Sequence, residues 1–264
     1  MSVCFRSSII YMISLKRGMT TLMKQTRLRF QWSHQALWHR TAIRVFNAIM
    51  QWLPFSIKYG VGMKMRTHSV PYSLIRDCRV VVQVGAPRDT LQSGRSRAMY
   101  FALFSDPKNR VIIVEPDPES AKLIGNMLKR QGIANVSVCA VGAWSEKKNL
   151  QLCVNNAHPA SNFIEGLVNY DDNRLREYHT INIPVNTVDN ILTENGIEQV
   201  DLVSITTNGA EREILQGMRK TLEAGVKYIA LNWADDYYVQ LMEKMGYTLM
   251  ALDDRGYTFR KNHQ

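Results

Sequence analysis

The chain has 264 residues, 45% of them hydrophobic, and a formal net charge of +10. This length accommodates one large α/β domain plus an extension, and an ordinary apolar share provides for a sizeable core. The four cysteines form neither a C-x-x-C pair nor a zinc-type spacing, which argues against a disulfide scaffold and favours a reducing compartment. No run reaches the roughly 18 apolar residues that a membrane-spanning helix requires.

The positive charge is concentrated at the N-terminal end. Residues 1–79 contain a single acid, Asp77, whereas the remainder of the chain is close to neutral. A basic arm favours an anionic partner such as membrane lipid, nucleic acid or an acidic domain, and a solvated leader is the alternative. We therefore divide the chain into a basic, partly helical extension, residues 1–72, and a main domain, residues 73–264. The expected location is the cytoplasm, with peripheral contact at the membrane.

Residues 38–53 show the pattern of an amphipathic helix, which ends before Pro54. Apolar and aromatic residues recur at steps of three and four, and basic residues occupy the other side. Such a helix suits an anionic membrane surface or a partner, but it equally suits a cover packed on the main domain. Residues 59–72 contain Gly60, Gly62 and Pro71, and they are interpreted as a linker.

From residue 79 onward, apolar runs alternate with helical patterns. Strands are predicted over residues 80–84, 111–114, 136–141, 150–154, 181–185, 201–205 and 227–231. Helices are predicted over residues 96–104, 117–131, 210–223 and 237–245, with a further one that Thr187 caps. Residues 158–180 look polar and irregular, and residues 247–260 form a hairpin. This order predicts a Rossmann-like, doubly wound, mostly parallel sheet whose last strand is an antiparallel hairpin strand.

In such a sheet the ligand lies beyond the carboxyl ends of the strands. Gly85 follows the first strand without a G-x-G-x-x-G motif, so a dinucleotide site of that type is disfavoured. Glu115 and Pro116 follow the second strand, where a carboxylate accepts hydrogen bonds from both ribose hydroxyls of an adenosine. Val141 and Trp144 follow the third strand and are placed to line an adenine slot, although Trp144 also suits the core.

Taken together, these segments resemble the FkbM-type class I methyltransferases between about residues 80 and 231. The markers are Val84-Gly85-Ala86, residues 111–119 with Glu115-Pro116, Ala140-Val141-Gly142, Thr187-Val188-Asp189, and residues 201–217 with Gly209-Ala210-Glu211. The resemblance implies S-adenosylmethionine (SAM) as cofactor, with Gly85 and Ala86 around its methionine part and Glu115 on its ribose. It also implies methylation of a hydroxyl on a small molecule or glycan, namely a sugar or secondary metabolite.

The chain departs from the family pattern at several acids. Gln83 stands where the family has Asp, Thr206 and Asn208 replace a later Asp and Glu, and Asn232 ends the next strand. Fewer carboxylates bind a sulfonium cation less well. The alternative function is therefore a catalytically degenerate fold that binds a ligand or partner and is anchored by its basic arm.

Transfer of a methyl group to a hydroxyl benefits from a general base. We select Glu211 and His158 as the candidate catalytic residues, with His179, Asp171 and Asp172 behind them. No carboxylate cluster suggests a metal, so none is predicted.

Three arginines precede or begin the first helix of the domain. Arg88 or Arg95 is placed to meet the carboxylate of SAM or another anion, unless these arginines are solvated. Nucleic acid is disfavoured as a partner, because no Asn-Pro-Pro-Tyr-like motif follows the strand at residues 201–205.

Overall fold

A computed structural model describes residues 49–50 and 52–262. The amphipathic helix predicted over residues 38–53 lies almost wholly outside this part of the chain. From Met50 the described residues belong to one compact unit. Within them, no helix combines the length and apolar character that crossing a membrane demands.

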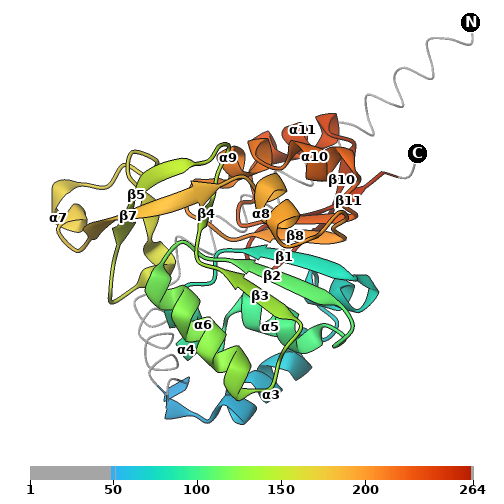
Figure 1. Ribbon diagram of the computed structural model, residues 1–264, viewed down its shortest axis with the longest axis horizontal. Helices are drawn as coiled ribbons and strands as arrows, with labels where there is room; N and C mark the ends of the chain where they lie inside the picture. The colour runs from blue at the N-terminus through green and yellow to red at the C-terminus, as the bar shows by residue number, and fades with distance from the viewer. Residues whose placement is uncertain (1–48, 51, 263–264) are drawn as a thin grey trace, which may run out of the picture. The chain divides into compact units, whose positions relative to one another are not determined.

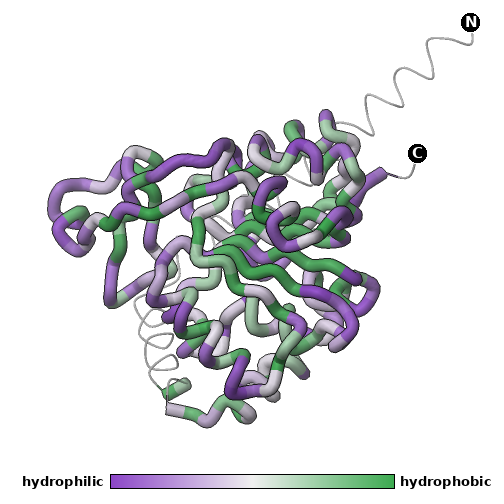
Figure 2. The backbone as a smooth tube through the Cα atoms, viewed as in Figure 1, coloured by the Kyte–Doolittle hydropathy of each residue, from purple (hydrophilic) through white to green (hydrophobic). Residues whose placement is uncertain are grey.

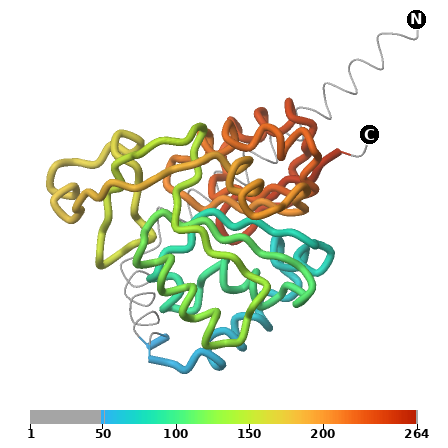
Figure 3. The backbone as a smooth tube through the Cα atoms, in the orientation of Figure 1, coloured from blue at the N-terminus to red at the C-terminus, as the bar shows by residue number. Residues whose placement is uncertain are grey.

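The unit is built on a seven-stranded sheet (Figure 1). Its strands, in spatial order, are β10 (Tyr247–Leu252), β11 (Tyr257–Lys261), β9 (Tyr228–Leu231), β8 (Leu202–Ile205), β1 (Val80–Val84), β2 (Arg110–Val114) and β3 (Val136–Cys139). Five of them, β9, β8, β1, β2 and β3, pair in parallel, and β11 is antiparallel to both of its neighbours. This confirms the Rossmann-like prediction with its antiparallel hairpin strand. Figure 3 shows β1 and β8 side by side although they are far apart in the sequence.

Both faces of the sheet are covered by helices, as expected for parallel strands that are mostly apolar (Figures 1 and 2). On one face of the sheet, Val81 and Val111 form a core together with one set of helices. This set consists of α3 (Phe55–Arg66), η1 (Tyr72–Asp77), α4 (Arg88–Gln92), α5 (Arg97–Phe104) and α6 (Pro118–Arg130). Val82 and Ile112 point into the opposite core. Its helices are α8 (Val188–Glu194), α9 (Glu211–Gln216), α10 (Arg219–Glu223) and α11 (Asp236–Lys244).

A second, four-stranded sheet lies above the carboxyl edge of the first. Its order is β4 (Gly142–Ala143), β7 (His179–Asn186), β5 (Lys148–Val154) and β6 (Phe163–Ile164). The irregular segment predicted over residues 158–180 is therefore partly wrong, because it contains β6, η2 (Pro159–Ser161), α7 (Asp172–Leu175) and the start of β7. These elements are too short to show a periodicity, and β6 exists only through its pairing with β5.

The linker predicted over residues 59–72 is also wrong, since most of it is helix α3 followed by η1. Tyr59 is buried and donates its hydroxyl to the Leu91 carbonyl at 2.9 Å. A Cβ on Gly62 would lie 1.7 Å from the Tyr100 hydroxyl, so this glycine allows close helix packing rather than breaking the helix. Gly62, one of the residues that suggested a linker, thus reflects tight contact, whereas Gly60 has open space around its Cβ position.

The helix predicted over residues 210–223 is split into α9 and α10. Gly217 separates them, and a Cβ there would lie 1.9 Å from the Trp144 carbonyl oxygen. Two predicted helix starts are confirmed, since the side chains of Asp117 and Thr187 accept N-cap hydrogen bonds at α6 and α8.

A buried ion-pair network joins α5 to the β10–β11 turn. Nη2 of Arg97 lies 3.0 Å from Asp253 and 2.5 Å from Asp254, and its side chain is 1% exposed. Nη1 donates to the Ser204 hydroxyl on β8 at 3.3 Å, and Tyr72 donates to Asp254 at 2.9 Å. The network therefore fixes the antiparallel hairpin against the helical layer.

Replacing Arg97 with Met should lower the free energy of unfolding by about 3–5 kcal/mol, because it leaves the Asp253 carboxylate buried without its cation. Urea unfolding followed by circular dichroism measures the loss. Lys227→Met is the control, since it removes an ion pair with Asp201 whose lysine is 59% exposed, and should cost less than about 1 kcal/mol. Equal losses in the two variants would contradict the structural role of the buried network.

Candidate functional site

A cavity opens at the carboxyl ends of β1, β2 and β8, where a doubly wound sheet binds its ligand. It encloses about 630 Å³, open space at its mouth included. The loops after the strands supply Gly85, Pro87, Glu115, Pro116, Gly142, Ala143, Trp144, Thr206, Thr207 and Asn208. An apolar wall comes mainly from the second sheet and α9, with Leu152, Phe163, Ile164, Val185 and Ile214.

Glu115 is 4% exposed, and both of its carboxylate oxygens accept backbone hydrogen bonds. Oε2 accepts from the Ala86 N–H at 2.5 Å, and Oε1 accepts from the Asp117 N–H at 2.9 Å. Burial raises the pKa of Glu115 to about 7, the two N–H groups lower it, and the nearby carboxylates of Asp117 and Asp89 raise it. The structure thus joins the two halves of the predicted site, the Gly85 loop and Glu115, by a direct contact.

The need for glycine at position 85 comes from the neighbouring strand. Gly85 has φ +89°, and a Cβ there would lie 2.3 Å from the Thr206 carbonyl oxygen. The loop after β1 therefore lies against the loop after β8 with no room for a side chain. Sequence reasoning assigned this glycine to the ligand, but the backbone of Thr206 already requires it.

Gln83, which replaces the family's acid, lies buried beneath this contact. Its Nε2 donates to the Gly85 carbonyl at 2.9 Å and to the Thr206 hydroxyl at 2.8 Å. A carboxylate donates no hydrogen bond, so an aspartate at position 83 has nothing to offer the carbonyl. The neutral residues at positions 83 and 206 thus hold the ends of β1 and β8 together.

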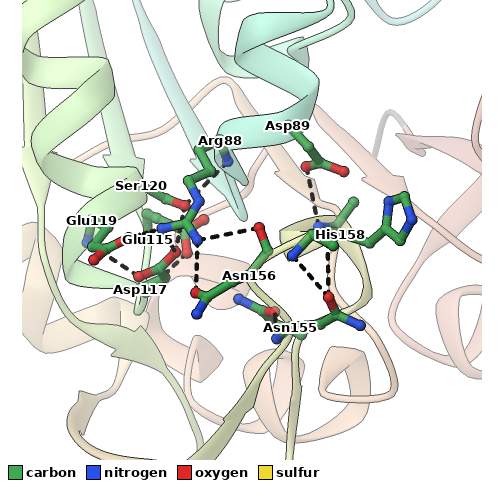
Figure 4. Close-up of polar contacts among 12 residues, drawn as sticks. Arg88, Asp89, Glu115, Asp117, Glu119, Ser120, Asn155, Asn156 and His158 are labelled. Carbon is green, nitrogen blue, oxygen red and sulfur yellow. Dashed lines mark hydrogen bonds and ion pairs between the residues drawn. The ribbon is translucent and has the colours of Figure 1, made fainter. Parts of the chain in front are cut away.

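Residues 155–162, here called the covering segment, contribute Pro159, Ala160 and Asn162 to the cavity wall. Asn208, the second neutral replacement, donates from Nδ2 to the Ala160 carbonyl at 2.9 Å and to the Asn162 carbonyl at 2.8 Å. On the other side Asp89 accepts from the Ala160 N–H at 3.1 Å (Figure 4). The covering segment is thus held from the ends of both β1 and β8.

Arg88 adds a third attachment of the covering segment. Its Nη2 donates to Oδ1 of Asn156 at 2.8 Å, and its Nη1 pairs with Glu119 on α6 (Figure 4). Arg95 donates from Nε to the Ser93 hydroxyl at 3.1 Å. Neither arginine lines the cavity, so the structure engages both in contacts within the protein.

The remaining predicted cofactor residues divide into two groups. Pro116 and Trp144 line the cavity, and Trp144 is 7% exposed, so it belongs to both the cavity wall and the core. Ala86 contributes its N–H to Glu115 and is buried behind the wall. Val141 packs against the core and does not line the cavity.

The two candidate catalytic residues lie outside the cavity wall. Glu211 is fully buried at the start of α9, where its Oε1 accepts from the Thr207 hydroxyl at 2.8 Å. Burial raises the pKa of Glu211, and hydrogen bonds from the backbone and Thr207 offset part of that rise. His158 is exposed on the covering segment.

The further base candidates are also exposed, and Asp171 caps α7 by accepting from the Arg174 N–H. Among the described residues that line the cavity, Glu115 is the one with an ionisable side chain. In the described part of the chain, no three His, Cys, Asp or Glu side chains gather in a way that could hold a metal ion.

The fold is a Rossmann-like domain with a cavity at the carboxyl edge of its sheet. Residues 83–259 match the model of the methyltransferase FkbM domain. Because the match covers more than half of the chain, the protein belongs to the FkbM methyltransferase family. No curated protein matches the sequence.

Several solved structures are similar. A methyltransferase FkbM from Methylobacillus flagellatus KT is 15% identical over 83% of this chain and 58% of its own, with a TM-score of 0.45. The chain thus spans less than two thirds of that protein. A methyltransferase from Geobacter sulfurreducens is 13% identical over 82% and 95% of the two chains, with a TM-score of 0.41. The O-methyltransferase TomG from Streptomyces achromogenes, solved in complex with SAM, is 13% identical over 72% and 78%, with a TM-score of 0.40.

Gly85→Ala should destabilise the protein more than Gly132→Ala. Both glycines have positive φ, but Gly132 has open space around its Cβ position, whereas Gly85 faces the Thr206 carbonyl. The overpacking at Gly85 should add about 1–3 kcal/mol to the loss of unfolding free energy, measured with urea. Equal losses would show that the β8 loop moves away at no cost.

Asn208→Asp should release the covering segment, because an aspartate cannot donate to the carbonyls of Ala160 and Asn162. Hydrogen–deuterium exchange of residues 155–162 should become faster. Asn156→Asp is the matched control, since Asn156 accepts from Arg88 through Oδ1 and an aspartate keeps that role. Unchanged exchange in Asn208→Asp would refute the attachment.

Proposed function

We propose that the protein is a SAM-dependent methyltransferase that binds the adenosine part of the cofactor in this cavity. The observation that carries the proposal is the buried Glu115 carboxylate on the cavity wall, bonded to the Ala86 N–H of the glycine loop. The acceptor we propose is a hydroxyl of a sugar or secondary metabolite, in line with the family resemblance. Membership of the FkbM family supports methyl transfer as the reaction class.

The residues present fit an adenosine. Each oxygen of Glu115 accepts one backbone N–H, which leaves lone pairs for the two ribose hydroxyls. Trp144, Leu152 and Val185 provide apolar surface of the kind that an adenine ring packs against. Gly85, without a side chain, lets the ligand approach the backbone at the end of β1.

The charged part of the cofactor meets a different environment. When bound, SAM supplies a methyl group made electrophilic by its positively charged sulfonium. Thr206, Thr207 and Asn208 line that region of the strand ends with neutral groups, and Glu115 is already shared by two N–H donors. We therefore expect S-adenosylhomocysteine (SAH), which lacks the sulfonium charge, to bind at least as tightly as SAM.

As the acceptor oxygen bonds to the methyl carbon, the bond from that carbon to the sulfonium sulfur must break, SAH is the leaving group, and the hydroxyl proton passes to water at the open mouth of the cavity. Since Glu211 and His158 lie outside the wall, we propose that positioning of the acceptor by the wall residues contributes most of the rate. The same observation favours a second function, a degenerate methyltransferase fold that binds an adenosine ligand without turnover. Ligand binding without consumption of SAM would distinguish it.

Isothermal titration with SAM and with SAH tests the proposal directly. Binding of either in the micromolar range, abolished or weakened at least about tenfold in Glu115→Ala, is the expected result. Thermal unfolding of the variant shows whether its fold survives the loss of the carboxylate. If neither compound binds at millimolar concentration, the methyltransferase proposal is lost.

The affinity for SAH should rise with pH. The folded pKa of Glu115, about 7, lies above its usual value, so the carboxylate that accepts ribose hydroxyls forms as pH rises through 7. Between pH 6 and pH 8 the ionised fraction, and with it the affinity, should increase roughly tenfold. Glu115→Gln should bind weakly and show a flat profile, whereas Glu198→Gln, outside the cavity wall, should behave like the wild type.

The contribution of Glu115 to the stability of the fold should have the opposite pH dependence to the affinity for SAH. Because the raised pKa favours the protonated form in the folded state, the contribution of Glu115 is fully present below its unfolded pKa and is lost as pH rises through about 7. The unfolding free energy of the wild type, relative to Glu115→Gln, should therefore fall between pH 4.5 and pH 7. Urea titrations at several pH values give this difference. A constant difference would contradict the raised pKa.

A further inference from the structure

Large apolar side chains that are exposed gather on one short stretch of the described chain. Trp52 is 89% exposed and Met65 is 76% exposed, and Ile57 and Val61 are about half exposed. Ile57, Val61 and Met65 are spaced by four residues, so they form one stripe along the outer side of α3. We call these three residues the α3 stripe.

The inner side of α3 fixes its rotation. The Tyr59 hydroxyl is bonded to the Leu91 carbonyl, and Gly62 packs so closely on Tyr100 that no larger residue fits. The Arg66 guanidinium lies over the Tyr100 ring, 4.6 Å from its centroid. Because these contacts hold the helix, the α3 stripe cannot turn into the core of the described domain.

The surroundings of the stripe are positively charged. Lys64 is exposed next to Val61 and Met65, and residues 49–76 contain no acid. Beside the helix lies a groove of about 1020 Å³, open space included, with Trp52, Phe55 and Met127 on its walls and Arg130 at its rim. The sequence that precedes α3 continues the same charge, since it is rich in Lys and Arg and lacks acids.

We propose that the α3 stripe and Trp52 form a contact surface for an anionic lipid bilayer. Aliphatic side chains enter the boundary between headgroups and acyl chains, and tryptophan favours the headgroup level. Lys64 and Arg130 then face anionic headgroups, which supply the negative charge that this surface lacks. A second copy of the chain brings the same positive charge to the interface, so self-association on this face is electrostatically unfavourable.

Co-sedimentation of the full-length protein with vesicles tests the proposal. The protein should pellet with vesicles of phosphatidylcholine and phosphatidylserine, and remain in the supernatant with phosphatidylcholine alone. The triple variant Ile57→Ser, Val61→Ser, Met65→Ser should lose at least tenfold in affinity for the anionic vesicles. Lys64→Glu should also weaken binding, most strongly at low salt.

Met250→Ser with Leu252→Ser is the matched control, because both residues are similarly exposed on β10. This variant should bind like the wild type. Thermal unfolding by circular dichroism establishes that each variant is folded.

The proposal is overturned if the wild type does not bind anionic vesicles. It is also overturned if the folded triple variant binds as the wild type does, since the basic residues before α3 then act alone. A wild-type dimer that the triple variant dissociates, without vesicle binding, would assign the stripe to a second copy instead.

Discussion

The structure depends on the close contact between the loops at the carboxyl ends of β1, β2 and β8. At this point the Ala86 N–H meets the buried Glu115 carboxylate, and Gly85 lies against the Thr206 carbonyl. Three strands that are distant in sequence are thereby locked at one edge of the sheet. The cavity lies at this edge, and Glu115, the ionisable residue among the described ones that line it, owes its raised pKa to its burial there.

The neutral residues that depart from the family pattern have a positive structural role. Gln83 and Asn208 donate hydrogen bonds to backbone carbonyls, which carboxylates cannot do. These hydrogen bonds hold the ends of β1 and β8 together and attach the covering segment. In this chain the neutral side chains therefore take part in holding the site together.

The β10–β11 hairpin and helix α3 are held to the domain by different interactions. On the β11 side a buried arginine with two aspartates positions the hairpin against α5. On the α3 side the same helical layer is closed by tyrosine and glycine contacts, which leave an apolar stripe facing outward. Interior packing thus decides which residues remain available at the surface.

The sequence by itself determined the sheet and the position of Glu115. Runs such as residues 80–84 and 111–114 are mostly apolar and β-branched, so they form buried parallel strands, and an acid directly after such a strand lies at the ligand edge. Local patterns also identified Thr187 as a helix cap and placed the start of a helix at Asp117. Other features have no local signal. Gly62 resembles a linker residue until Tyr100 packs against the helix, and β6 requires β5 as its partner.

The sequence made Glu211 and His158 candidate catalytic residues. Only the tertiary structure showed that Glu211 lies behind the cavity wall and that His158 is exposed on the covering segment. It also showed that Asn208 belongs to the covering segment's support. The physical reason is that periodicity and residue type report the burial of one element. Which side chains meet depends on pairings across more than a hundred residues, such as that of Gln83 with Thr206.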